Sequence, residues 1–177
     1  MTESDQAVAE QTAPNAGGSA NGDTQRLERL ILPEGIAPPS AYAEADRQQA
    51  VADLLVENRF DPPGLPPGPY ALLLELREGR LLLDIRDLQD RPLHGFALAL
   101  GPFRRLIKDY LMIVASHEEA VQSESQDSRI QAIDMGRRGL HDEGAGLLIE
   151  RLEGRVALDF ATARRLFTLV CALHHRV

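Results

Sequence analysis

The sequence predicts an α+β fold, in which a three- to four-stranded antiparallel meander is packed on one face by about four helices. Strand-like apolar runs gather between residues 70 and 100, and a short turn separates the first two of them. After residue 102 the apolar residues recur mostly at helical spacing. Because strands precede most of the helices instead of alternating with them, the α+β class is favoured.

The first 25 residues are predicted to be a disordered acidic tail. They hold no base and no aromatic residue, and their acids are Glu3, Asp5, Glu10 and Asp23. Such a segment cannot bury enough apolar area to offset the entropy lost on ordering. Residues 26–177 have the size and apolar content of a single α+β domain.

A short strand and a helix are expected at the start of this domain. The run RLERLILP at 26–33 alternates weakly and ends at a proline, which predicts the strand. Pro38, Pro39 and Ser40 then supply a helix start, and near-helical apolar spacing follows to about Asn58. The segment DPPGLPPGP at 61–69 contains five prolines and predicts a stiff, polyproline-like connector.

The clearest strand pattern is the hairpin YALLLELREGRLLLDIRD at 70–87. Its two apolar runs flank a short turn at Glu78-Gly79. The run PLHGFALAL at 92–100 continues the pattern as a third antiparallel strand.

Three helices are expected after the sheet. Gly101-Pro102 begins the first, which runs to about residue 122, and the second runs from about 129 to 152. A brief strand can form near 156–158, and Asp159 can then cap the last helix. Apolar residues cover most of the circumference of this last helix, so we expect it to be the most buried.

Composition excludes several classes of protein. The formal net charge of −8 disfavours nucleic acid as a partner, because that binding depends on neutralising phosphates. The single Cys171 excludes an internal disulfide and predicts a buried thiol in a reducing compartment. No apolar run approaches the roughly 18 residues of a membrane span, and the N-terminus lacks a secretory signal pattern. We expect a soluble cytoplasmic protein that does not interact with membranes.

One segment, DMGRRGLHDEGAG at 134–146, breaks the local rules of the helix that contains it. Placed on one helix, Asp134, Arg137 and His141 fall on the apolar face, while Arg138, Asp142 and Glu143 fall outside it. Buried charges are costly unless they satisfy one another, so their neighbour spacing predicts a polar network. The five donors of the Arg137 guanidinium also require a partner from another element.

Glycines make the same segment unusual. Four of them stand in three turns, at 136, 139, 144 and 146, and each disfavours a helix interior by about 1 kcal/mol relative to alanine. Two explanations stay open: another chain segment lies close against a continuous helix, or a loop interrupts the helix here.

The leading functional hypothesis is a non-enzymatic binding or regulatory module that presents residues 134–146 at an interface with an unknown protein or a second copy. The alternative is an enzyme or receptor for a small anion that uses Asp134, Arg137 and His141. No serine or cysteine nucleophile has a signature nearby, so no residue is assigned as catalytic. No metal site or cofactor is predicted either, because His117-Glu118-Glu119 lacks a second zinc-binding histidine. The ligand or interface candidates are Asp134, Arg137, Arg138, His141, Asp142, Glu143, Gly144 and Gly146.

Three long motifs carry a family resemblance: FRRLIKDY at 103–110, AIDMGRRGLHDEGAGLLIERLEGRV at 132–156 and DFATARRLFTLVCALH at 159–174. Through them the chain resembles a small bacterial family catalogued as uncharacterised protein family 0262, from about residue 26 to the end. The resemblance implies a cytoplasmic bacterial protein and supplies no activity, cofactor or site residue.

Overall fold

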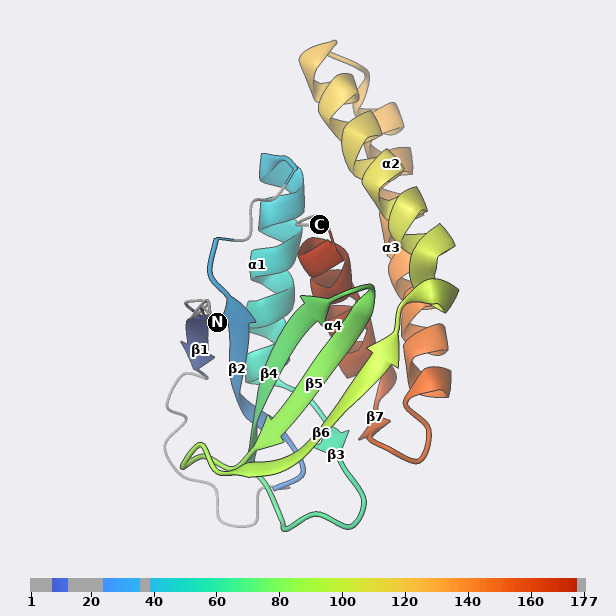
Figure 1. Cartoon of the computed structure of the whole chain (residues 1–177). Coiled ribbons are helices and arrows are strands. Elements are labelled where there is room, and N and C mark those ends of the chain that lie inside the picture. Colours follow the sequence, from blue (N-terminus) through green and yellow to red (C-terminus); the bar gives the residue numbers. More distant parts are fainter. Residues whose placement is uncertain (1–7, 13–23, 36–38, 175–177) are drawn as a thin grey trace, which may run out of the picture.

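A mixed five-stranded sheet forms one layer of the structure, and helices cover one of its faces (Figure 1). This computed structural model describes residues 8–12, 24–35 and 39–174. The sheet has the strand order β1-β2-β4-β5-β6. Its strands are β1 (Val8–Thr12), β2 (Leu27–Pro33), β4 (Tyr70–Arg77), β5 (Arg80–Arg86) and β6 (Pro92–Ala99). A separate short pair joins β3 (Phe60–Asp61) to β7 (Ala157–Leu158).

The predicted antiparallel meander is confirmed for β4, β5 and β6, which pair antiparallel in sequence order. The prediction of a three- to four-stranded, purely antiparallel sheet is wrong in detail, because β2 lies parallel to β4. Parallel neighbours require a crossover, and the helix between β2 and β4 provides it. Strand periodicity carries no information on the direction of pairing, so the sequence did not distinguish the two arrangements.

Strand β1 lies inside the stretch that we expected to be disordered. It pairs antiparallel with β2, with Val8 opposite Pro33 and Thr12 opposite Arg29. Composition alone missed this strand, because its backbone hydrogen bonds depend on an edge that β2 leaves open. The rest of that stretch falls largely outside the described residues, which omit 1–7 and 13–23.

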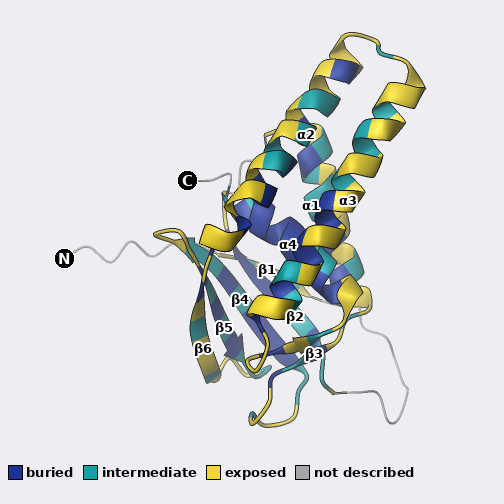
Figure 2. Cartoon of the chain, turned by 90° about the vertical axis from the view of Figure 1, so that its right-hand side faces the viewer, coloured by how far each residue is buried: buried dark blue, intermediate teal, exposed yellow. Residues whose placement is uncertain are grey.

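The helices begin and end close to the predicted positions. They are α1 (Ala41–Val56), α2 (Arg104–Gln122), α3 (Asp127–Arg151) and α4 (Phe160–His174), and the 3₁₀ turn η1 (Gly101–Phe103) precedes α2. Helix α1 packs on β2, and α4 packs on β4, on α1 and on α3. The end of α2 and the start of α3 form a hairpin that extends beyond the rest of the fold (Figures 1 and 2).

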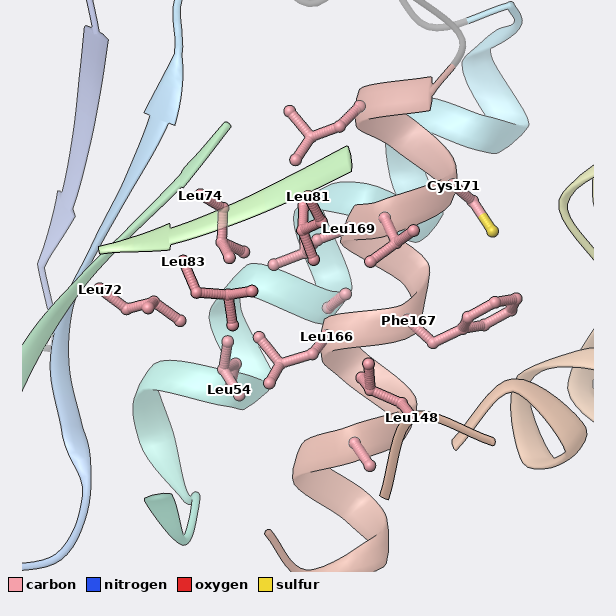
Figure 3. Close-up of a cluster of buried hydrophobic side chains, with 14 of the residues drawn as sticks. Leu54, Leu72, Leu74, Leu81, Leu83, Leu148, Leu166, Phe167, Leu169 and Cys171 are labelled. Carbon is pink, nitrogen blue, oxygen red and sulfur yellow. The ribbon is translucent and has the colours of Figure 1, made fainter. Parts of the chain in front are cut away.

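Helix α4 lies at the centre of the core. Leu166 and Leu169 point toward the leucines of β4 and β5, while Phe167 and Cys171 project from the opposite side of the helix (Figure 3). Nine of its 15 residues are buried, against five of 16 in α1, which confirms the expected burial. Cys171 is fully buried, and this burial raises the pKa of its thiol.

Removing the cap of α4 gives a first testable prediction. The Asp159 carboxylate accepts a hydrogen bond from the backbone N–H of Thr162 at 2.8 Å. We expect Asp159→Ala to lower the free energy of unfolding by about 1 kcal/mol, measured by urea denaturation. Asp159→Asn keeps an accepting oxygen and is the control; equal losses in both variants would contradict a capping role.

Candidate functional site

Helix α3 is continuous through residues 134–146, which decides between the helix and the loop interpretations. Its inner side carries Arg137 and His141, whose side chains are 16% and 5% exposed. Asp134, at 29%, lies at the border of that side. Arg138, Asp142 and Glu143 are exposed, as their helical positions predict.

Asp46 of α1 is the residue on which the inner polar groups converge. Its Oδ1 accepts a hydrogen bond from Arg137 Nη1 at 2.5 Å, and its Oδ2 accepts one from the Tyr110 hydroxyl of α2 at 2.8 Å. The same Oδ2 lies 3.2 Å from His141 Nε2. The Asp46 side chain is only 9% exposed, so one nearly buried carboxylate joins α1, α2 and α3.

A second set of bonds extends this arrangement toward the N-terminus of α1. The Tyr42 hydroxyl donates to Asp134 Oδ1 at 2.7 Å and accepts from Arg137 Nε at 2.8 Å. Arg137 Nη2 lies 2.9 Å from the same Asp134 oxygen. The Tyr42 ring stacks on His117 of α2, with ring centroids 3.7 Å apart. We name the whole set the Asp46 network; its members are Tyr42, Asp46, Tyr110, Asp134, Arg137 and His141.

The sequence identified half of this network. The Asp134–Arg137 pair and the need for an outside partner of Arg137 were predicted, and both are confirmed. Arg137 and His141, however, meet through Asp46. Sequence reasoning missed Asp46 together with Tyr42 and Tyr110. Asp46 lies among other acids on a polar helix, and nothing local distinguishes a carboxylate that faces α3 from one that faces water.

Burial and hydrogen bonding shift the pKa values of the two carboxyl groups of the network, Asp46 and Asp134, in opposite directions. Burial raises the pKa of Asp46, but the His141 hydrogen bond and the Arg137 charge together outweigh it and hold the pKa below the ordinary 3.8. At Asp134, burial is likewise outweighed by hydrogen bonds from Tyr42 and Arg137, and the pKa is again lowered. Both groups are therefore held as carboxylates in the folded state.

These lowered pKa values predict acid sensitivity. A carboxyl whose pKa is lower folded than unfolded stabilises the protein above its unfolded pKa, and that stability is lost as the pH falls through the folded pKa. We expect the urea midpoint to fall as the pH drops below about 4, the ordinary pKa of an unfolded aspartate. In Asp46→Asn this decline should be shallower, because one of the two groups no longer titrates. An equally steep decline in this variant would contradict the prediction.

Gly144 and Gly146 have different surroundings. A Cβ at position 144 would lie 2.5 Å from Cε1 of the Phe167 ring, so the predicted close approach is that of a neighbouring helix. Gly146 has open space at its Cβ position and borders a separate hollow near β7. The two glycines therefore do not line the same site as Arg137 and His141.

A pocket of about 270 Å³ lies where α1, α3 and α4 meet, and the Asp46 network forms part of its wall. Four arginines and two aspartates line it, a surplus of two positive charges in a chain of net charge −8. The lining residues are Asp46, Gln49, Ala50, Asp53, Arg137, Arg138, His141, Arg164, Arg165 and Thr168. We name this hollow the arginine pocket.

The arginines of the pocket differ in the hydrogen bonds and ion pairs that they already make with other residues. Arg137 binds Tyr42, Asp46 and Asp134 within the Asp46 network. Arg138 forms an ion pair with Asp134 in which Nε lies 3.2 Å from the carboxylate. Arg164 forms one with Asp142, in which Nε lies 2.6 Å from the carboxylate but does not have hydrogen-bond geometry. Arg165 donates one Nη1 bond to the Glu57 carbonyl at 3.1 Å. Among the described residues, the terminal nitrogens of Arg138 and Arg164 make no hydrogen bond to the protein beyond these ion pairs.

The contacts of His141 indicate whether this residue is placed to act as a general base. Its Nε2 lies 3.2 Å from Asp46 and 3.3 Å from Thr168 Oγ1. In a hydroxyl–imidazole–carboxylate relay, the hydroxyl and the carboxylate bond to different ring nitrogens. Here both groups meet the same nitrogen, and Asp134 bonds to Tyr42 and Arg137 instead of to His141. This arrangement fits a structural histidine better than a general base.

Metal-binding and membrane-spanning features are absent from the part of the chain that the structure describes. These residues contain no group of three or more metal-ligating side chains that could hold an ion. None of their helices combines the length and apolar character needed to cross a membrane.

Comparison with known proteins places the chain among proteins of unassigned activity. A family model described as an uncharacterised protein family, UPF0262, matches residues 24–176. A UPF0262 protein of Granulibacter bethesdensis is 55% identical over 163 residues, covering 87% of this chain and 92% of its own length. Counterparts from Acidiphilium cryptum and Maricaulis maris are each 53% identical over 152 residues, covering 85% of this chain and 93% and 94% of their own lengths. No solved structure matches the chain.

Proposed function

The chain belongs to the uncharacterised protein family UPF0262, which has no assigned activity, and we propose from the site itself that it is a non-enzymatic module that binds a small anion in the arginine pocket. One observation carries this proposal: Arg138 and Arg164 line the pocket, and among the described residues their terminal nitrogens make no hydrogen bond to the protein. Guanidinium groups recognise carboxylate and phosphate through paired N–H donors. The lining holds four arginines and two aspartates, which favours the same class of ligand.

The Asp46 network supports binding by holding the pocket wall rigid. It fixes Arg137 with bonds to three side chains, so a ligand meets a preorganised surface and loses less free energy to ordering. The His141 geometry supports binding over catalysis for the reason given above.

Calorimetric titration at low ionic strength with inorganic phosphate, and separately with succinate, tests the proposal, since salt screens exposed charges. We expect at least one of these anions to bind, and Arg164→Gln to weaken it about tenfold. The matched control is Arg129→Gln, because Arg129 also lies on a helix surface but contacts Ser125 outside the pocket. No binding of either anion, or equal weakening by both variants, would refute the proposal.

Presentation of residues 134–146 at a protein interface stays a separate prediction. The inner side of this segment is occupied by α1, α2 and α4, so an interface would have to use its outer side. Met135, 71% exposed, lies there together with the exposed Arg138, Asp142 and Glu143. Sedimentation velocity of the wild type and of Met135→Glu tests it: a larger species lost in the variant would support self-association.

A further inference from the structure

The arginine pocket has two chemically different walls. Arg138 from α3 and Arg164 and Arg165 from α4 supply guanidinium donors. The α1 wall supplies oxygen acceptors from Gln49 and Asp53, which are joined to each other by a hydrogen bond of 2.8 Å. A ligand that fills the pocket must therefore present negative charge to one wall and hydrogen-bond donors to the other.

Three properties of the lining narrow the class of ligand further. The lining holds four arginines against two aspartates, which favours an anionic ligand, and Asp134 and Asp142 next to the lining already pair with Arg138 and Arg164. Ala50 is the only apolar residue of the lining, and neither Phe, Tyr nor Trp is present among the lining residues, so a nucleobase or an acyl chain would find little surface to pack on. The volume of about 270 Å³ lies at the small end of ligand pockets.

We infer that the arginine pocket takes a small phosphomonoester that carries hydroxyl groups, such as a polyol or sugar phosphate. This inference rests on the proposed anion-binding function and specifies its ligand. The phosphate lies against Arg138, Arg164 and Arg165, where bidentate N–H pairs suit its oxygens. The hydroxyl groups donate to Asp53 and to the side-chain carbonyl of Gln49. A simple dicarboxylate would place its second charge against Asp53 and be disfavoured there.

The roles of the two walls can be separated with one substitution. Asp53→Ala removes a hydroxyl acceptor and a negative charge at once. For glycerol phosphate the lost hydrogen bond should weaken binding about tenfold. For inorganic phosphate, which gains nothing from the acceptor wall, binding should stay equal or become tighter because a repulsive charge is gone. The two ligands should thus respond in opposite directions or differ clearly in size of response.

The experiment is calorimetric titration of the full chain and of Asp53→Ala with glycerol phosphate, inorganic phosphate, succinate and glycerol. The inference predicts that glycerol phosphate binds most tightly to the wild type, and that glycerol alone does not bind. The matched control is Asp109→Ala, which removes an acid from the surface of α2, outside the pocket lining. It should leave all four titrations unchanged.

The outcomes separate this inference from the proposed function. If succinate binds as tightly as glycerol phosphate, or if Asp53→Ala affects both phosphates alike, the phosphomonoester assignment is wrong while anion binding stands. If none of the three anions binds the wild type, the proposed function fails and this inference fails with it.

Discussion

Replacing Asp46 by alanine is expected to lower the free energy of unfolding by about 3–5 kcal/mol, the usual effect of removing one partner from a buried ion pair. The variant leaves the Arg137 guanidinium, 16% exposed, without its partner on α1. It also removes the acceptor of the buried Tyr110 hydroxyl and the neighbour of His141. Urea denaturation monitored by circular dichroism measures the loss.

Asp109→Ala is the matched control for this prediction. Asp109 is also an acid paired with an arginine, Arg105, but the side chains of this pair are 39% and 65% exposed. Exposed pairs contribute only about 0–1 kcal/mol. Equal losses in the two variants would show that Asp46 is not the centre of a buried network.

A double variant tests whether the lower free energy of unfolding comes from the unpaired charge of Arg137. Asp46→Leu combined with Arg137→Met replaces the ion pair by apolar groups, and such replacements are often neutral or stabilising. We expect the double variant to be more stable than Asp46→Leu alone, with a non-additive difference of about 0.5–3 kcal/mol. Strict additivity would mean that the two side chains do not stabilise each other.

The second large effect is expected at Gly144, where alanine should destabilise the protein although alanine is the better helix former. The added Cβ would lie 2.5 Å from Cε1 of Phe167, a ring that is fully buried and has no open side. Overpacking of this kind costs about 1–3 kcal/mol, which exceeds the helix-propensity gain of about 1 kcal/mol. Helices α3 and α4 must separate to accept the methyl group.

Gly146→Ala is the control, since it makes the same change two residues along the same helix. Apart from its chain neighbours and the nearby backbone of α3 itself, no atom lies within 4 Å of its Cβ position, so only the propensity gain remains. We expect the free energy of unfolding to rise by about 0.5–1 kcal/mol. The two alanine variants should therefore change the thermal midpoint in opposite directions, and a shift of the same sign in both would refute the packing explanation.

The pocket and the network have separable roles in these experiments. Asp46 and Arg137 belong to the network that joins α1, α2 and α3, while Arg164 and Asp53 line the pocket without belonging to the network. Substitutions at Arg164 and Asp53 are therefore the appropriate tests of binding, because they leave the buried ion pair intact.

The sequence by itself determined the local elements of this protein. The turn residues of the β4–β5 hairpin, Ser40 before α1 and Asp159 before α4 act within a few residues of their own position, so their pattern predicts where each element begins. Helical periodicity likewise placed Arg137 and His141 on the inner side of α3, because it depends only on the rotation per residue.

Only the tertiary structure decided which elements meet. The parallel pairing of β2 with β4, the pairing of β1 with an open edge, and the contact of Asp46 with Arg137 across 91 residues of sequence all depend on chain segments that are distant in sequence. The arginine pocket has the same origin, because Arg137 and Arg138 come from α3 and Arg164 and Arg165 from α4. Local propensity carries no information about such long-range contacts, since their free energy exists only once the helices have packed.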